Sequence, residues 1–228
     1  MDFSKFISLL ETRSLHFTSL EVLAERFDKF EGHYPYPAVP MKDTSGTMQY
    51  LPLETFRGFE LTKKGGFVNC WHINEGESYA MWKVYSNMGE GIAIRSTIQN
   101  LWDSFAKNPN DILVGEVDYD FEVLAQLPKE KWPRFDPKIL YLHKTSCFSY
   151  EKELRAIIEI ASLGKDGFYV PSNYSEGIDL QVKLNELVEK IFVSPYSPEW
   201  YKPLIEKILI RYNLNKKVEQ SIIDAKPL

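Results

Sequence analysis

YEKELRAIIEI, residues 150–160, runs from a cluster of charges directly into an apolar segment rich in isoleucine. This pattern predicts a β-strand that starts near Arg155, with acidic residues where a loop gives way to a sheet. Alternation along a strand places Glu151, Glu153 and Arg155 on one face. Two carboxylates and a guanidinium on one wall indicate either a site of chemistry or a solvated strand entrance in which Arg155 neutralises its neighbours.

The composition predicts one globular domain over residues 1–228, because 44% hydrophobic content supplies a sizeable core. A net charge of -5 argues against a large nucleic-acid-binding surface. Cys70 and Cys147 show no metal-type spacing with the four histidines, so we predict reduced thiols and neither a metal site nor a disulfide framework. The charged N-terminus and the lack of an apolar run of about 20 residues predict a soluble, cytoplasmic protein with no membrane partner.

Apolar periodicity predicts many short elements in mixed order. The predicted helices cover residues 2–11, 50–61, 77–85, 98–107, 138–143 and 201–212, with a further helix capped by Ser19 and closed by residues 27–32. The predicted strands cover residues 15–18, 67–73, 91–95, 112–119, 155–160, 168–170, 178–182, 191–193 and 218–223. No glycine-rich phosphate loop supports a doubly wound fold. We therefore predict an α+β domain with a mixed, mainly antiparallel sheet flanked by short helices.

Residues 33–48, HYPYPAVPMKDTSGTM, contain three prolines and Gly46 among small polar residues. This composition predicts a long irregular loop. Loops of this kind often form lids or binding surfaces.

Aromatic residues gather in residues 69–95, NCWHINEGESYAMWKVYSNMGEGIAIR. Trp82 and Tyr85 are three residues apart on a predicted helix, hence on one face, and Trp71 lies on the strand before it. Such a platform could stack on a nicotinamide or an adenine, or it could belong to the core.

These two stretches resemble a bacterial family of unknown function, the domain family numbered 2971. Its pattern has a strand ending in Cys or Phe, a Met-Trp-x-x-Tyr helix leading to Gly-x-x-Ile, and a Lys followed by aromatic-Glu-x-Glu-x-Arg. The matching positions are Cys70, Met81, Trp82, Tyr85, Gly91, Lys144, Tyr150, Glu151, Glu153 and Arg155. The resemblance extends over residues 14–223. Residues 27–31, FDKFE, are similar to the family's Asn-Asp-Pro-Phe-Glu but lack its Asn and Pro.

The chain is also similar, more loosely, to the ADP-ribosyltransferase fold. That similarity implies a His or Arg on a first strand, a Tyr or Ser near a second and a Glu on a later one, and His16, Tyr85 and Glu153 occur in this order. It implies NAD as the cofactor and an unknown protein or nucleic-acid acceptor. A carboxylate suits this chemistry because the ribosyl transition state resembles an oxocarbenium ion.

The similarity divides the candidate residues into two groups. The catalytic candidates are Glu153, Glu151 and His16, and the candidates for binding the dinucleotide are Tyr85, Trp82, Trp71, Arg155 and Lys144. His16 could equally be a hydrogen-bonded structural residue. We expect Arg155 to be structural, with a bidentate pair to Glu151, or to Glu31 or Asp28 of the N-terminal segment.

Two other classes of function stay open. A metal-dependent nuclease could use Asp118 or Asp120 together with Glu151, Glu153 and Lys152, although the acidic composition argues against it. A non-catalytic module could bind a nucleotide or a peptide in an aromatic pocket that the charged cluster only braces. The sequence leaves open whether the protein acts in phage defence, as a toxin or in housekeeping.

Overall fold

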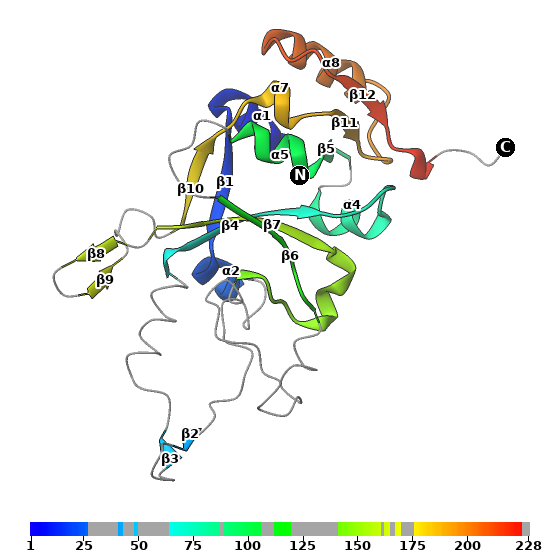
Figure 1. The fold of residues 1–228 in the computed structure, drawn as a ribbon. Helices are drawn as coiled ribbons and strands as arrows, with labels where there is room; N and C mark the ends of the chain where they lie inside the picture. The colour runs from blue at the N-terminus through cyan, green and yellow to red at the C-terminus, as the bar shows by residue number, and fades with distance from the viewer. Residues whose placement is uncertain are drawn as a thin grey trace. The chain divides into compact units, whose positions relative to one another are not determined.

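The computed structural model describes residues 1–26, 41–42, 48–49, 64–86, 89–105, 112–119, 141–160, 162–164, 167–169 and 176–224. The chain forms two compact units, each assembled from separate stretches of sequence. Figure 1 labels the helices and strands of both units. Unit 1 comprises Met1–Leu15, Asn74–Pro109 and Asp179–Leu228, and unit 2 comprises His16–Ile73 and Asn110–Ile178. Short helices and mainly antiparallel strand pairs confirm the predicted α+β class.

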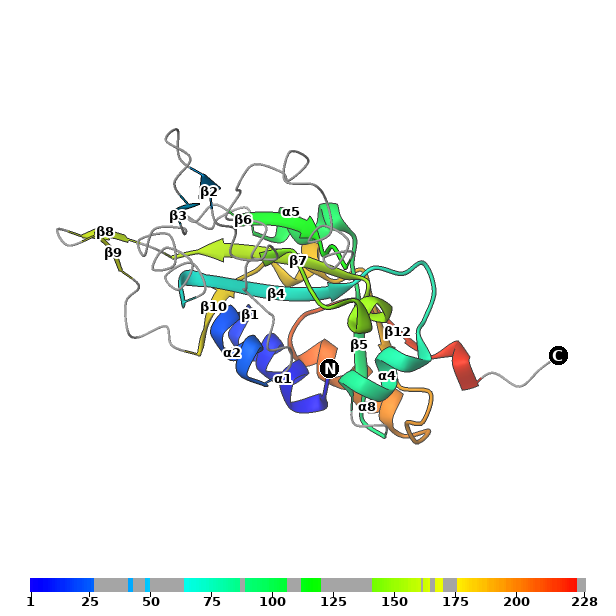
Figure 2. The ribbon, with the colours of Figure 1, turned by 90° about the horizontal axis from the view of Figure 1, so that it is seen from below.

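The largest sheet is five-stranded, with the strand order β10-β1-β4-β7-β6, and its strands β4, β7 and β6 lie wholly in unit 2. Its strands are β10 (Gly177–Gln181), β1 (Ser14–Ser19), β4 (Gly66–His72), β7 (Glu153–Glu159) and β6 (Ile112–Glu116). β7 pairs antiparallel with β4 along its whole length and with β6 on its other side. Figure 2 shows β4 and β7 lying side by side. The segment predicted as the central strand therefore is a central strand.

β7 is buried on both faces from its first residue to Ile158. A near-continuous apolar run is typical of a strand covered on both sides. Ile157 belongs to a core cluster with Leu20, Val68 and Tyr141. The charged residues that open β7 are therefore buried, and the expectation of a solvated strand entrance is wrong.

The charges before β7 do not lie on the strand, contrary to the prediction. Residues Ser146–Glu151 form a 3-10 helix, η3, and Lys152 follows it with φ 41° and ψ 59°. This left-handed residue interrupts the extended backbone, so strand alternation cannot place Glu151 on the face of Glu153. The strand begins at Glu153, two residues earlier than predicted.

The N-terminal part of unit 2 follows the sequence signals closely. β1 passes directly into the helix α2 (Leu20–Arg26). The backbone N–H of Val22 donates to Oγ of Ser19 at 3.2 Å, which satisfies one of the free donors at the helix start. The predicted cap at Ser19 is confirmed.

Unit 1 contains a three-stranded mixed sheet with the order β12-β11-β5 and several helices. Its elements are α1 (Phe3–Thr12), α4 (Tyr79–Tyr85), β5 (Ile92–Arg95), α5 (Ile98–Ser104), α7 (Leu184–Leu187), β11 (Lys190–Val193), α8 (Tyr201–Arg211) and β12 (Lys217–Gln220). β11 is antiparallel to β5 and parallel to β12, and α8 provides the crossover between the parallel strands. Side chains of Ser78 and Thr97 cap α4 and α5.

Several predictions fail or fall outside the described residues. In the predicted irregular loop, Met41–Lys42 (β2) pairs with Met48–Gln49 (β3). The strand predicted at 168–170 is found at Gly167–Tyr169 (β9), where it pairs with Ser162–Gly164 (β8). The predicted last strand ends at Gln220 and is followed by a 3-10 turn, Ile222–Asp224. Residue 143 forms a bridge rather than the end of a helix. The predicted helix at 50–61 and the family segment at 27–31 lie outside the described residues.

Candidate functional site

Four charged side chains form a buried group in unit 2, which we call the β7 cluster: Lys144, Glu151, Glu153 and Arg155. Arg155 is 0% exposed, Glu151 3%, Glu153 6% and Lys144 8%. Charged residues are almost never this buried unless they are paired. Two cations and two carboxylates balance the charge of the cluster.

Glu153 is the acceptor at the centre of the β7 cluster. Its Oε2 receives hydrogen bonds from Nη2 of Arg155 at 2.7 Å and from Nε at 3.2 Å, and Nζ of Lys144 lies 3.5 Å away. The third nitrogen of the guanidinium, Nη1, donates to the carbonyl oxygen of Tyr141 at 2.8 Å. Among the described residues, the ion pair of Arg155 is with Glu153, two residues away on the same strand face, rather than with Glu151. Glu31 and Asp28, the other predicted partners, lie outside the described residues.

Lys144 connects the two carboxylates. Its Nζ lies 2.5 Å from Oε2 of Glu151 and also over the ring of Phe148, at 4.9 Å from the centroid. The backbone N–H of Lys144 donates to the carbonyl oxygen of Asp118, just beyond β6. The chain after β6 thus positions the lysine opposite η3.

The strained junction before β7 is held by main-chain hydrogen bonds on both sides. Lys152 carries a left-handed backbone, which costs a residue with a side chain on the order of 1 kcal/mol. The carbonyl oxygen of Lys152 accepts from the N–H of Ile73 at 2.8 Å, and the N–H of Glu153 donates to Oη of Tyr119 at 2.9 Å. Strain retained between two buried glutamates is typical of a functional site.

The β7 cluster keeps Glu153 ionised. Burial alone would raise the pKa of Glu153, but the charges of Arg155 and Lys144 and hydrogen bonds from Arg155 and Cys70 outweigh it, so this pKa lies below its usual value. The folded carboxyl therefore binds its proton less readily than the carboxyl of the unfolded chain, whose pKa is about 4.3.

We expect this ionised state to appear as acid sensitivity. The stabilisation from Glu153 is complete above about pH 4.3 and is lost as the pH falls through the lower pKa of the folded state. Urea unfolding of the wild type and of Glu153→Gln should be measured at about pH 6 and about pH 3.5. We expect the difference in the free energy of unfolding between the two proteins to be smaller at the lower pH. Equal losses in both proteins would contradict the assignment.

Two side chains beside the β7 cluster were not predicted as site residues. Cys70 and His72 lie two apart on β4, and their cross-strand partners are Arg155 and Glu153, so all four side chains share one face of the sheet. Nδ1 of His72 lies 2.5 Å from the carbonyl oxygen of Glu151. Nε2 of the same ring is enclosed by protein and has no hydrogen-bond partner among the described residues. A buried acceptor in this state costs about 1–3 kcal/mol.

His16 lies on the same sheet as the β7 cluster, but it does not lie next to the cluster. It is exposed on β1, and β4 separates that strand from β7. Its imidazole faces β10 instead, since a Cβ at Gly177 would lie 2.7 Å from Nε2 of His16. The described contacts of Glu153 are with Arg155, Lys144, Cys70 and Tyr119, and not with His16.

Three glycines differ in the space around them, which gives a graded prediction for their replacement by alanine. At Gly177, the Cβ of an alanine would lie 2.5 Å from the backbone oxygen of Phe17. At Gly115 it would lie 2.8 Å from a methyl group of Leu142, and at Gly76 it would lie in open space. We expect Gly177→Ala to cost about 1–3 kcal/mol, because a backbone atom cannot move aside as a side-chain end can. Gly115→Ala should cost less, and Gly76→Ala should be close to neutral. Chemical denaturation of the three variants checks this order, and an unaffected Gly177→Ala would contradict it.

The predicted aromatic residues differ in their burial and in their hydrogen-bond partners. Trp71 is half-buried, donates Nε1–H to Oδ1 of Asn69 and, as the neighbour of His72 on the strand, lies on the face opposite Glu153. Trp82 is buried and donates Nε1–H to Oε2 of Glu77, whereas Tyr85 is 45% exposed. Tyr85 and Trp82 belong to unit 1, and the β7 cluster belongs to unit 2.

The residues proposed for a metal-dependent nuclease are only partly described. Asp118 is exposed and forms a parallel bridge with His143, while Asp120 lies outside the described residues. Among the residues that the structure describes, no group of three His, Cys, Asp or Glu side chains could hold a metal ion. In the same part of the chain, no helix has the length and apolar character needed to cross a bilayer.

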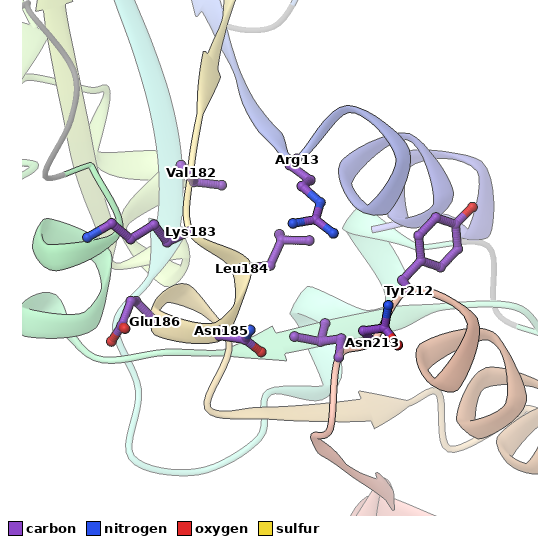
Figure 3. Close-up of a pocket in the computed structure, with 9 residues that line it drawn as sticks. Arg13, Val182, Lys183, Leu184, Asn185, Glu186, Tyr212 and Asn213 are labelled. Carbon is purple, nitrogen blue, oxygen red and sulfur yellow. The ribbon is translucent and has the colours of Figure 1, made fainter.

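Unit 1 contains a hollow of about 420 Å³ that none of the predicted site residues lines (Figure 3). The ends of two helices meet there, since Arg13 follows α1 and Tyr212 follows α8. The carbonyl end of a helix carries partial negative charge, which the cation of Arg13 complements at the end of α1. Tyr212 donates its hydroxyl proton to Glu11.

Comparisons with known proteins add no relative: no family model, curated protein or solved structure matches the chain. Membership of the unknown-function family and similarity to ADP-ribosyltransferases therefore stay predictions. The functional assignment depends on the β7 cluster itself.

Proposed function

We propose that the β7 cluster is the centre of an ADP-ribosyltransferase-like enzyme that consumes NAD. The observation that supports this is an ionised carboxylate, Glu153, at the first position of a central strand, held in one orientation by a guanidinium and an ammonium group. A fixed negative charge beside the ribose stabilises the positive charge that develops at C1′ as the bond to nicotinamide breaks. Nicotinamide leaves with the bonding electrons, and water or an acceptor group bonds to C1′ and releases a proton.

The remaining members of the β7 cluster have separate roles in this proposal. Glu151, the second carboxylate, orients a ribose hydroxyl, and Lys144 holds both carboxylates at a fixed separation through its 2.5 Å and 3.5 Å contacts. Arg155 positions Glu153 rather than contacting NAD, because its three guanidinium nitrogens are engaged with Glu153 and Tyr141. The acceptor is a protein or nucleic acid, or water.

The test is calorimetric titration of the purified full chain with NAD, together with an assay for nicotinamide release with and without cell lysate as a source of acceptor. Binding and release are the expected results. A wild-type protein that neither binds nor consumes NAD under these conditions would overturn the proposal.

A second candidate is a binding module without catalysis, and the internal pairing of the β7 cluster favours it. Each carboxylate already has a cationic partner, and all four side chains are at least 92% buried, as expected of a bracing network. In that case NAD or another nucleotide binds in the titration, but no nicotinamide is released.

A further inference from the structure

We infer that the hollow in unit 1 is a binding site for a small organic anion, a carboxylate or a phosphate monoester, whose charged group pairs with Arg13. The proposed function uses no residue of this hollow. Its size is the first support, because a volume of about 420 Å³ lies within the range of about 300–1,000 Å³ that is usual for small-ligand pockets.

The lining of the hollow has the composition of a ligand site. Val182, Leu184 and Leu214 are buried and supply an apolar surface. Asn185 and Asn213 supply side-chain amides, which can donate to an oxyanion or form a hydrogen bond with a neighbouring polar group of the ligand. An apolar surface with a small number of polar groups selects a ligand that has an apolar body and a polar end.

Arg13 supplies the charge that defines the polar end of the ligand. Figure 3 shows its side chain pointing into the space between Leu184 and Tyr212, whereas Lys183 and Glu186 extend away from it. Among the residues that the structure describes, the side chain of Arg13 has no hydrogen bond, ion pair or ring contact. A guanidinium holds its N–H donors in a rigid fork that matches the oxygens of a carboxylate or a phosphate group. The ligand is therefore an anion.

The end of α1 does not require the guanidinium for its hydrogen bonds. The carbonyl oxygen of Arg13 accepts from the N–H of Val182 at 2.8 Å. The carbonyl oxygen of Thr12 accepts from Nε2 of Gln181 and from Oγ of Ser14, each at 3.0 Å. The backbone of Arg13 is left-handed, with φ 51°, a conformation in which glycine is the usual residue at the end of a helix. An arginine at this position has a conformational cost, which a binding role explains.

Arg13→Gly separates binding from folding. It removes the guanidinium and also relieves the left-handed backbone, so we expect a melting temperature equal to or higher than that of the wild type. Loss of binding in this variant would then not be a consequence of unfolding. The matched control is Arg211→Gln, which removes a cation from the last turn of α8, next to Tyr212 in the sequence but outside the lining of the hollow.

The probes are phenyl phosphate and benzoate, with benzamide as the neutral probe of the same ring. NMR of the ¹⁵N-labelled full chain follows Nε–H of Arg13 and the side-chain amides of Asn185 and Asn213. We expect at least one of the two anions to shift these resonances at about 1 mM in the wild type and in Arg211→Gln, and to bind Arg13→Gly about tenfold or more weakly. The anion that binds more tightly distinguishes a phosphate site from a carboxylate site.

Four results would overturn the inference. They are no shift with either anion at about 10 mM, equal affinity of the anions for Arg13→Gly and the wild type, equal affinity of benzamide and benzoate for a site that does not bind phenyl phosphate, and a clear fall in the melting temperature of Arg13→Gly. The last result would make Arg13 a structural residue of the helix end. Because the binding and turnover of NAD are measured separately, this inference and the proposed function can each fail without the other.

Discussion

Arg155→Met is expected to lower the free energy of unfolding by about 3–5 kcal/mol, the usual cost of removing one member of a buried ion pair. The side chain of Arg155 is 0% exposed, and its three nitrogens donate to Glu153 and to the carbonyl of Tyr141. Without it, the buried carboxylate of Glu153 keeps Lys144, at 3.5 Å, as its cationic neighbour among the described residues. Urea or thermal unfolding of the purified variant measures the effect.

Two further variants control this prediction. Arg155→Lys keeps the charge but cannot reproduce the fork that contacts two partners at once, so we expect a smaller but clear fall in the melting temperature. Arg95→Met makes the same change as Arg155→Met at an exposed pair, Arg95 with Glu189, and should cost less than about 1 kcal/mol. Unchanged stability of the Arg155 variants together with lost activity would show that Arg155 is catalytic.

Glu153→Gln is expected to reduce nicotinamide release by about 100-fold or more, because it removes the charge that the transition state needs. The structure adds a second effect, since the substitution leaves the buried guanidinium of Arg155 without its carboxylate. Loss of activity in this variant alone would therefore not separate catalysis from folding.

The double variant Glu153→Gln/Arg155→Met separates the two effects. It removes one positive and one negative charge, so the β7 cluster is again balanced by Lys144 and Glu151. We expect the double variant to lose less free energy of unfolding than the sum of the losses of the two single variants, because the two side chains are in direct contact. It should still lack nicotinamide release. Recovery of release with recovered stability would assign Glu153 a bracing role and favour the binding module.

Apolar periodicity predicted most of the regular structure. The strand predicted at 67–73 is found at Gly66–His72, and the helix predicted at 201–212 is found at Tyr201–Arg211. These elements bury one face or stripe in a core, and the burial pattern is visible in the sequence. The strand β7 was also predictable, because a strand that is buried on both faces appears in the sequence as a continuous apolar run.

The geometry of the β7 cluster was only partly predictable. Alternation correctly placed Glu153 and Arg155 on one face, but the left-handed backbone of Lys152 separates Glu151 from that face. A left-handed backbone is uncommon for lysine, so the sequence does not predict it at this position. The contact between Lys144 and Glu151 depends on how η3 folds back. His72 could have been found from alternation on β4, had the register with Glu153 been known.

The order of segments along the chain has a consequence for synthesis on the ribosome. The last stretch of unit 2, Asn110–Ile178, leaves the ribosome before the last stretch of unit 1, Asp179–Leu228. At usual elongation rates of about 5–20 residues per second, unit 2 has on the order of seconds to form its sheet around β7 while unit 1 still lacks β11, α8 and β12. During this interval β5 lacks its partner strand β11, and α5 lacks the helix α7 on which it packs, so unit 1 can be completed only after unit 2.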